Sequence, residues 1–494
     1  MFIGIDLGTS GVKAIVLDRQ GVVRATGTAP LTVAQPQPLW REQDPADWWR
    51  ATERALAALL DEARQAGIKP AAIEALGLTG QMHGATVLDA QGQVLRPAIL
   101  WNDGRASVEC AELEARVPAA RAITGNLVMP GFTAPKLLWL ARHEPALFDR
   151  IDKVLLPKDW LRRQLCGVLA SDLSDAAGTA WLDVARRDWS DELLAACGLS
   201  RHHMPTLHEG PAITGRLLPA LARRWGLGEI PVVAGGGDNA AGAVGVGVVR
   251  PGQAMLSLGT SGVCFAVTDG FLSAPEHAVH SFCHALPGTW HTMSVMLSAA
   301  SCLDFAATLT GLGSVAELVA QAESLDPARH DGAPLFLPYL NGERTPHNNP
   351  HAQAAFFGMT AATTRADLAY AVLEGVGLGL ADGLQALAAS GSRLDEITLI
   401  GGGSRSAWWS QLLADISGHT LVRRDGGEVG PALGAARLAW LGTDGAQADM
   451  ATVCAQPPER ARHRPDSARH AALQARHQRF QALYQHVAPL FMPR

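Results

Sequence analysis

A five-residue sequence occurs twice in the chain, once near its start and once just past its midpoint. Leu7-Gly8-Thr9-Ser10-Gly11 recurs as Leu258-Gly259-Thr260-Ser261-Gly262, and in both places one apolar run precedes it and another follows. A run of three glycines after a strand-like stretch also occurs once in each half, at residues 235–237 and 401–403. Two glycine motifs in the same order in both halves indicate two duplicated domains. We expect the boundary between them near residues 243–253, around Arg250-Pro251-Gly252.

Strand-like and helix-like segments alternate along the chain, which predicts an α/β fold. The first 27 residues predict strands joined by a turn at residues 18–21. A long amphipathic helix is expected to begin at Pro45, after Asp44 as its N-cap, and to end at Gly67. The resulting division is an N-terminal domain at 1–245, a C-terminal domain at 246–440 and a helical C-terminal tail at 441–494. The Arg-rich stretch of that tail is interpreted as a solvated helix face.

Composition narrows the class of protein. The 494 residues are 48% hydrophobic and 18% charged, which predicts a folded chain of two to four domains. The formal net charge of −6 argues against a nucleic-acid partner. The seven cysteines are an odd number and no pair has CxxC spacing, so we expect neither disulfides nor a zinc site, and a cytoplasmic location. The sequence has no run of about 18 apolar residues and no signal-peptide pattern, so no membrane association is expected.

The repeated loop is suited to binding phosphate. A turn of glycine, threonine and serine between two strands presents backbone N–H groups and hydroxyls, and glycine allows close approach of the ligand. Two such loops facing each other across a cleft would hold a nucleotide, although each alone could be a plain hairpin turn. The chain has no GxxxxGK[ST] sequence and no GxGxxG sequence, which excludes a P-loop and argues against a dinucleotide fold or a protein-kinase lobe.

Two aspartates follow strand-like runs close to these glycine motifs. Asp6 precedes the first loop, and a carboxylate beside phosphates is best explained by a bridging Mg²⁺, with the capping of a turn as the alternative. The second copy of the motif has Ser257 at the equivalent position, so a metal ion should lie nearer the first loop. Asp238 follows the first triple glycine and could accept a proton from an attacking alcohol, or simply cap a helix. Asn239, beside it, could hydrogen-bond a neighbouring hydroxyl.

Two further polar segments follow apolar runs and could bind a polyol. They are Gln81-Met82-His83-Gly84-Ala85 and Trp101-Asn102-Asp103-Gly104-Arg105. Amides, guanidinium groups and an aromatic wall are common in sugar pockets. A single histidine such as His83 is nevertheless more often structural.

These motifs, in this order, resemble the FGGY family of carbohydrate kinases. The resemblance covers residues 1 to about 440 and rests on two phosphate motifs, an adenosine motif and two longer family patterns: Ile5–Gly11, Leu256–Gly262, Gly401–Ser404, Gly131–Leu140 and Ala354–Glu374. It implies an actin-like, ribonuclease-H-like fold in each domain, ATP in the cleft between the domains with its adenosine on the second, and a homodimer.

The resemblance also implies roles for individual residues. Asp238 would be the general base and Asp6 would act on Mg²⁺. The sugar would contact Met82, His83 and Asn239, with Trp101, Asn102 and Arg105 as weaker candidates. The terminal phosphates would lie against Thr9, Ser10 and Lys13 on one side and Gly259 and Thr260 on the other. The adenosine would lie against Gly402, Gly403 and Ser404.

Four segments are similar to the members of the family that phosphorylate D-xylulose: Leu39–Pro45, Gln81–Ala85, Trp101–Arg105 and Gly342–Pro350. We therefore expect ATP-dependent conversion of D-xylulose to D-xylulose 5-phosphate. Two alternatives stay open at this point, a kinase for another ketose or polyol and an actin-like ATPase that performs conformational work.

Overall fold

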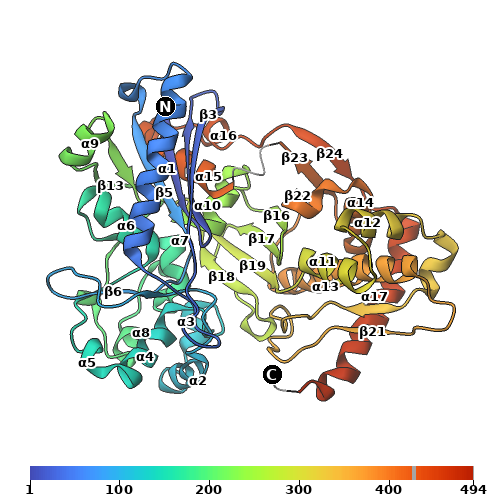
Figure 1. Ribbon diagram of the computed structural model, residues 1–494. Coiled ribbons are helices and arrows are strands. Elements are labelled where there is room, and N and C mark those ends of the chain that lie inside the picture. The colour runs from blue at the N-terminus through green and yellow to red at the C-terminus, as the bar shows by residue number, and fades with distance from the viewer. Residues whose placement is uncertain (426–429, 493–494) are drawn as a thin grey trace.

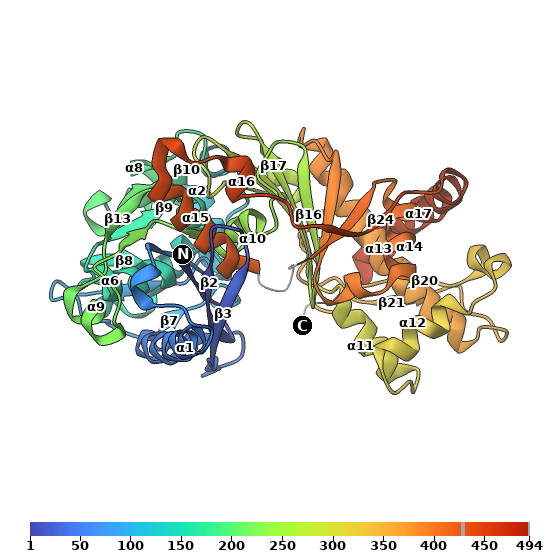
Figure 2. The same cartoon turned by 90° about the horizontal axis from the view of Figure 1, so that it is seen from above.

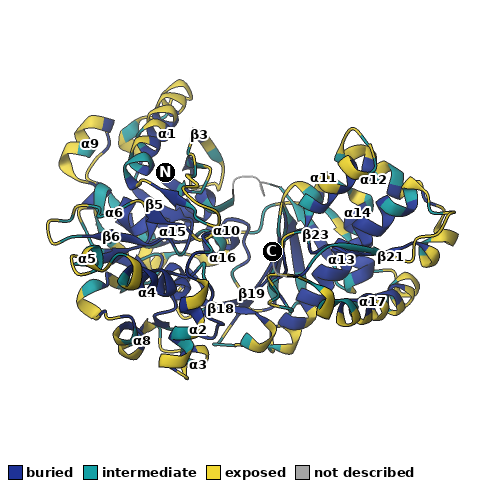
Figure 3. Cartoon of the chain, turned by 60° about the horizontal axis from the view of Figure 1, so that its bottom comes forward, coloured by how far each residue is buried: buried dark blue, intermediate teal, exposed yellow. Residues whose placement is uncertain are grey.

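Two α/β domains lie side by side in the computed structural model, which describes residues 1–425 and 430–492 (Figure 1). Each domain is built on a seven-stranded mixed sheet. Buried residues line the sheets and the inner faces of the helices, while exposed residues lie on the outer faces (Figure 3). The expected two-domain α/β architecture is confirmed.

The first sheet has the strand order β13-β14-β5-β1-β2-β3, with β15 paired to β5. The strands β1, β2 and β3 form an antiparallel meander, and β1, β5 and β14 run parallel to one another. The bounds are β1 (Phe2–Leu7), β2 (Gly11–Leu17), β3 (Val23–Pro30), β5 (Ala75–Gly80), β13 (Ile213–Arg216), β14 (Pro231–Val233) and β15 (Gly236–Gly237).

The second sheet repeats this pattern, with the order β18-β19-β17-β16-β22-β23-β24. Its β16 pairs antiparallel with β17 and parallel with β22, as β1 does with β2 and β5. The bounds are β16 (Gln253–Leu258), β17 (Gly262–Thr268), β18 (His280–Cys283), β19 (Trp290–Met296), β22 (Glu396–Ile400), β23 (Leu421–Arg424) and β24 (Glu459–His463). The duplicated glycine loops therefore join equivalent strands, which confirms the duplication.

The two triple glycines, in contrast, do not occupy equivalent places. Gly235–Gly237 follow β14, whereas Gly401–Gly403 follow β22, which is the counterpart of β5. The counterpart of β14 is β23, and the residues after it, 426–429, lie outside the described part of the chain. The prediction that these glycines form a second repeat was therefore wrong, because the two glycine turns follow strands at different positions in the two sheets.

Helix α1 (Pro45–Gln65) begins where the sequence predicts. The Asp44 carboxylate accepts a hydrogen bond from the Ala46 N–H at 2.9 Å, and Pro45 occupies the first turn. Its apolar face, including the fully buried Trp48, packs on β2 and β3. The helix gives way to Gly67, which has a φ of +76°.

Two helices lie where the chain passes between the domains, and both pack on the first domain. Helix α10 (Asp238–Gly245) packs on α15 (Gly430–Asp444), and α15 also lies on β1 and β5 of the first sheet. The approach of the two helices is so close that a Cβ on Gly434 would lie 1.7 Å from the Ala241 carbonyl oxygen. Figure 2 shows α15 beside the N-terminal domain, although it follows the second domain's strands in sequence.

The C-terminal segment is divided between the domains. After α15 and α16 (Met450–Val453), the chain returns to the second domain, where β24 pairs with β23. Helix α17 (Ser467–Val487) then packs on α14 (Ala407–Ser417). The structure therefore does not divide at residue 440 into a domain and a separate helical tail. Helix α15 packs on the first domain, whereas β24 and α17 belong to the second.

Helix α13 (Arg365–Ala389) is, among the described residues, the one helix long and apolar enough to cross a membrane. Its most apolar stretch is 89% buried inside the fold. Such a helix, apolar all round, is typical of a protein core.

The remaining elements form an accessory lobe on the first domain and the helical layers of the second. In the first domain they are β4 (Glu42–Gln43), β6 (Thr86–Leu88), β7 (Ala98–Ile99), α2 (Ser107–Arg116), α3 (Ala120–Thr124), α4 (Thr133–His143), α5 (Pro145–Phe148), β8 (Lys153–Leu155), α6 (Pro157–Cys166), β9 (Ala170–Asp172), α7 (Leu173–Ala176), β10 (Leu182–Asp183), β11 (Asp188–Trp189), α8 (Asp191–Ala196), β12 (Thr206–His208) and α9 (Pro219–Trp225). In the second they are α11 (Ala300–Leu309), α12 (Val315–Glu323), β20 (Leu335–Leu337) and β21 (Ala355–Phe357).

Candidate active site

A cavity of about 210 Å³ lies between the two domains. It contains five residues that the sequence singles out for the sugar or the chemistry: Met82, His83, Trp101, Asp238 and Asn239. The second domain contributes the opposite wall, with Ser261, Val263, His280, Phe282, Met293, Val295 and Arg344. The polar groups of the first domain thus face a mainly apolar wall that carries one arginine.

Asp238 lies at the start of α10, directly after β15. It does not cap this helix, because Gly237 occupies the N-cap position. Its Oδ1 instead accepts hydrogen bonds from the backbone N–H of Asn239 at 2.8 Å and from Asn239 Nδ2 at 3.0 Å. Burial raises the pKa of Asp238 to about 6, even though these hydrogen bonds lower it. A carboxylate with such a pKa is ionised at neutral pH and is a competent general base.

Asp6 lies on β1, opposite Lys13 of β2 in the antiparallel register. Burial, together with the nearby charge of Asp238, raises the pKa of Asp6 to about 7, and Lys13 opposes the rise. The Oδ1 atom of Asp6 is buried and has no hydrogen-bond partner within the described residues. An unpaired carboxylate oxygen that is repelled by a second carboxylate fits a site for a divalent cation.

His83 follows β5 in a left-handed backbone conformation, with a φ of 67°. Its Nδ1 lies 2.6 Å from the Gly178 carbonyl oxygen, so Nδ1 must carry the proton and donate. Burial and the charges of Lys136 and Arg344 lower the pKa of His83 to about 3. The ring is therefore neutral, and its Nε2 is an acceptor suited to a hydroxyl donor.

Trp101 joins the cavity to the first phosphate loop. Its indole N–H donates to the Thr9 hydroxyl at 3.0 Å, and that hydroxyl donates to Gln81 Oε1 at 3.1 Å. Gln43 Nε2 also donates to the Thr9 carbonyl oxygen at 2.8 Å. The position of Thr9 is thus held by three side chains from different segments.

Two residues expected in the sugar pocket lie elsewhere. Asn102 is exposed in a turn and does not line the cavity. Arg105 is buried, with its guanidinium in ion pairs with Asp103 at 2.7 Å and Glu42 at 2.8 Å, and 3.7 Å from the centre of the Trp40 ring. Because these contacts occupy the guanidinium, Arg105 supports the fold around the pocket without lining it.

The two glycine loops are short turns at equivalent strand ends. The Gly8 N–H donates to the Gly11 carbonyl at 3.0 Å, and the Gly259 N–H donates to the Ser261 carbonyl at 3.1 Å. Ser10 and Thr260 are exposed at the loop tips. The N-terminus of α11 holds the second loop, since the Ala300 N–H donates to the Gly259 carbonyl at 2.9 Å.

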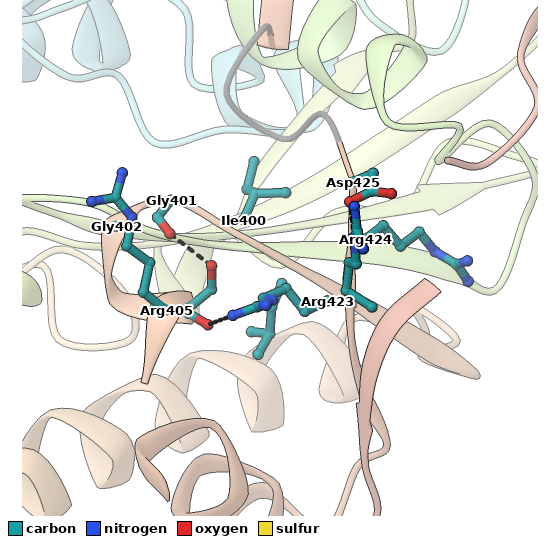
Figure 4. A pocket seen from close by; sticks show the side chains of 10 residues that line it. Ile400, Gly401, Gly402, Arg405, Arg423, Arg424 and Asp425 are labelled. Carbon is teal, nitrogen blue, oxygen red and sulfur yellow. Dashed lines mark hydrogen bonds and ion pairs between the residues drawn. The ribbon is translucent and has the colours of Figure 1, made fainter. Parts of the chain in front are cut away.

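A second cavity, of about 430 Å³, lies on the second domain beside the expected adenosine motif (Figure 4). Its walls are formed by Leu399, Ile400, Gly401, Gly402, Ser404, Arg405, Arg423, Arg424, Asp425 and Arg460. Gly401 has a φ of +87°, and a Cβ there would lie 2.7 Å from the Leu258 carbonyl oxygen. Gly403 does not line this cavity, and a Cβ there would lie 2.6 Å from the Trp409 ring and 2.9 Å from Leu258 Cβ. The arginines come from β23, β24 and the turn after β22, and the sequence motif identifies none of them.

A buried cluster of charges lies behind Asp238. Lys158 Nζ contacts Asp159 at 2.6 Å and Asp172 at 2.9 Å, and all three side chains are fully buried. Asp172 accepts a hydrogen bond from the Ser174 hydroxyl, and the Ser174 oxygen accepts the Gly237 N–H at 3.0 Å. The cluster therefore anchors the peptide that precedes Asp238. No spacing in the sequence indicates it, because its members come from α6, β9 and α7.

The sequence matches the two domains of a known protein family. Residues 1–245 match the N-terminal domain, and residues 254–442 the C-terminal domain, of the FGGY family of carbohydrate kinases. The chain belongs to this family. It is therefore a carbohydrate kinase, a transferase with ATP as its phosphate donor.

Several FGGY kinases are closely similar to the chain. The xylulose kinase of Escherichia coli is 65% identical over 442 residues, which cover 89% of this chain and 90% of that protein. The xylulose kinase of Klebsiella pneumoniae is 63% identical over 441 residues, covering 89% of each chain. Among solved structures, a "xyloylose kinase" from Brucella ovis superposes with a TM-score of 0.94 at 46% identity, covering 99% of both chains.

Proposed function

We propose that this FGGY kinase transfers the γ-phosphoryl group of ATP to O5 of D-xylulose, giving D-xylulose 5-phosphate and ADP. The observation that carries the proposal is the position of Asp238, which is ionised at neutral pH and lies in the cavity between the domains with His83 and Asn239. The similarity to bacterial xylulose kinases over nine-tenths of the chain supports D-xylulose as the acceptor.

Asp238 accepts the proton of the attacking hydroxyl. Its Oδ1 is held by Asn239, which leaves Oδ2 for the sugar. Asn239 and the neutral His83 bind further hydroxyls, and Met82 and Trp101 pack against the carbon chain. A positioned base of this kind contributes about 10² to 10⁴ in rate.

ATP binds with its adenosine in the cavity at Gly402 and Ser404, while Gly403 shapes the turn. Its phosphates extend toward the two loops, with Thr9, Ser10 and Lys13 on the first domain and Gly259 and Thr260 on the second. Closure of the domains about α10 and α15 would exclude water and align O5 with the γ-phosphorus.

Asp6 is suited to hold Mg²⁺, because its Oδ1 has no partner within the described residues and the charge of Asp238 opposes its ionisation. Among those residues, no group of three or more metal-ligating side chains occurs, so the phosphates of ATP and water would complete the coordination. When bound, Mg²⁺ neutralises negative charge on the transferred phosphoryl group.

We also propose a cytoplasmic homodimer. The seven cysteines are all buried and free, which suits a reducing compartment. Sedimentation of the purified protein would measure the mass of the assembly directly.

The reaction is tested by measuring ADP release with Mg²⁺-ATP alone and with D-xylulose, D-ribulose, L-ribulose, L-rhamnulose or glycerol. We expect a rise confined mainly to D-xylulose. A flat response to every sugar, with ATP still bound, would refute the assignment and favour another acceptor or a nucleotide switch.

A further inference from the structure

Arg344 is the one arginine that lines the cavity between the domains, among the residues that the structure describes. It belongs to the second domain, whereas Asp238, Asn239 and His83 belong to the first. Its guanidinium makes no ion pair within 4 Å in the described part of the chain. The carboxylate of the neighbouring Glu343 acts on its charge but accepts hydrogen bonds from the backbone N–H groups of Leu297 and Arg344. Arg344 is half-buried, and a guanidinium partly removed from water without an anionic partner is costly unless other acceptors satisfy its N–H groups.

One acceptor within the protein is a histidine. Arg344 Nη1 lies 3.2 Å from His280 Nε2, and since a guanidinium only donates, Nε2 must be the acceptor. His280 Nδ1 therefore carries the proton and lies 3.3 Å from the Oδ1 of Asn126.

Asn126 belongs to the first domain and binds the second. Its Nδ2 donates to the Ser281 carbonyl at 2.8 Å, and its Oδ1 accepts the Ser281 N–H at 3.0 Å. The orientation of the Arg344 guanidinium is thus set by a chain of hydrogen bonds that crosses between the domains. A guanidinium has five N–H groups, so most of them stay available to the cavity.

Arg344 lies at the His83 end of the cavity, because it contacts His280, and the rings of His83 and His280 both pack against Phe282, at 6.3 and 5.4 Å between ring centres. That end presents a cationic donor from one domain and a neutral acceptor, His83 Nε2, from the other. The pair is complementary to an α-hydroxyketone, whose carbonyl oxygen accepts hydrogen bonds and whose adjacent hydroxyl donates one.

We propose that Arg344 donates to the carbonyl oxygen of the ketose while His83 accepts from the neighbouring hydroxyl, so that the second domain selects ketoses over the corresponding polyols. The assignment rests on the proposed function, in which Asp238 binds the opposite end of the sugar at O5. It explains why a guanidinium without an anionic partner lies in a cavity that binds a neutral substrate.

The test is the affinity of the full-length protein for D-xylulose and for xylitol, which has an alcohol in place of the carbonyl, measured by calorimetry without nucleotide. In the wild type we expect tighter binding of D-xylulose. In Arg344→Met we expect D-xylulose binding to weaken by about tenfold or more, because a hydrogen bond from a charged donor is lost. Xylitol binding should change much less, so that the preference collapses.

Arg393→Met, which removes an exposed arginine of the same domain, is the matched control and should bind both compounds like the wild type. Arg344→Lys keeps the charge and should retain part of the preference, and it serves as the test if the methionine variant does not fold. Equal weakening of both compounds would overturn the carbonyl assignment. Unchanged sugar binding with weaker ATP binding would also overturn it and make Arg344 a phosphate ligand. Failure of the wild type to bind D-xylulose would instead refute the proposed function.

Discussion

Replacing Asp238 with asparagine should make the protein more stable and nearly inactive at the same time. Asparagine keeps the Oδ1 acceptor that binds both N–H donors of Asn239, so the local geometry is preserved. It removes the negative charge that burial opposes. Functional sites often carry groups that are unfavourable for folding, and this carboxylate is one of them.

The pKa of Asp238 gives the magnitude. A rise from the ordinary value of 3.8 to about 6 corresponds to about 3 kcal/mol against ionisation in the folded state. In the unfolded chain Asp238 ionises near pH 4, but in the folded protein it ionises near pH 6. Above about pH 6 the folded state therefore bears the full free-energy cost of the buried charge, and this cost disappears as the pH falls toward 4. We therefore expect Asp238→Asn to gain up to about 3 kcal/mol at pH 7.5 and almost nothing at pH 4.

Unfolding in urea, followed by tryptophan fluorescence at both pH values, measures the stability. Coupled ADP release measures kcat, which should fall by at least about 10². The matched control is Asp44→Asn, at the start of α1, because asparagine caps a helix about as well as aspartate. A variant with near-normal turnover, or one with no gain in stability at pH 7.5 relative to pH 4, would refute the reasoning. In the wild type, kcat/KM should decline as the pH falls through about 6, as the base becomes protonated.

Three further changes test other parts of the site. Asp6→Asn should raise the Mg²⁺ concentration needed for half-maximal activity by about 10- to 100-fold, and an unchanged Mg²⁺ titration would exclude its role as a ligand. Ser174→Ala leaves the buried Gly237 N–H without its acceptor, so kcat should fall by up to about 100-fold while the KM for ATP stays constant; a purely structural role would instead lower stability and leave kcat unchanged. Gly434→Ala places a methyl group 1.7 Å from the Ala241 carbonyl and should cost about 1–3 kcal/mol in urea unfolding, whereas Gly228→Ala, where the added carbon has room, should be neutral.

The duplication, the α/β class and the first helix could all be predicted from the sequence. A glycine turn between two strands and an N-cap followed by proline are local features, since each depends on residues a few positions apart. The same locality explains the error with the triple glycines. A turn motif does not indicate which strand of a sheet precedes it, and strand order is set by pairing between distant segments.

The contents of the site were decided only by the tertiary structure. From the sequence, Trp101, Asn102 and Arg105 are equally plausible sugar-pocket residues. In the structure Trp101 lines the cavity, whereas Asn102 lies in an exposed turn and Arg105 is held by buried carboxylates. Arg344 lies in Gly342–Pro350, a segment that the resemblance singles out, but nothing in the segment shows that Arg344 faces the first domain's pocket residues across the cavity. Whether a polar side chain binds substrate or supports the fold depends on which distant groups occupy its hydrogen-bonding capacity.

The pKa values of Asp6 and Asp238 also depend on the tertiary structure. Sequence indicates that Asp6 and Asp238 end strands beside glycine turns, and the resemblance implies their roles. Their pKa values of about 7 and about 6 arise from burial and, for Asp6, also from the charge of Asp238, which follows Asp6 by 232 residues in the sequence. Sequence therefore determined which chemical groups are present and which turns carry them. Tertiary structure determined their burial and mutual distance, because desolvation and Coulomb interactions depend on the arrangement of the whole fold.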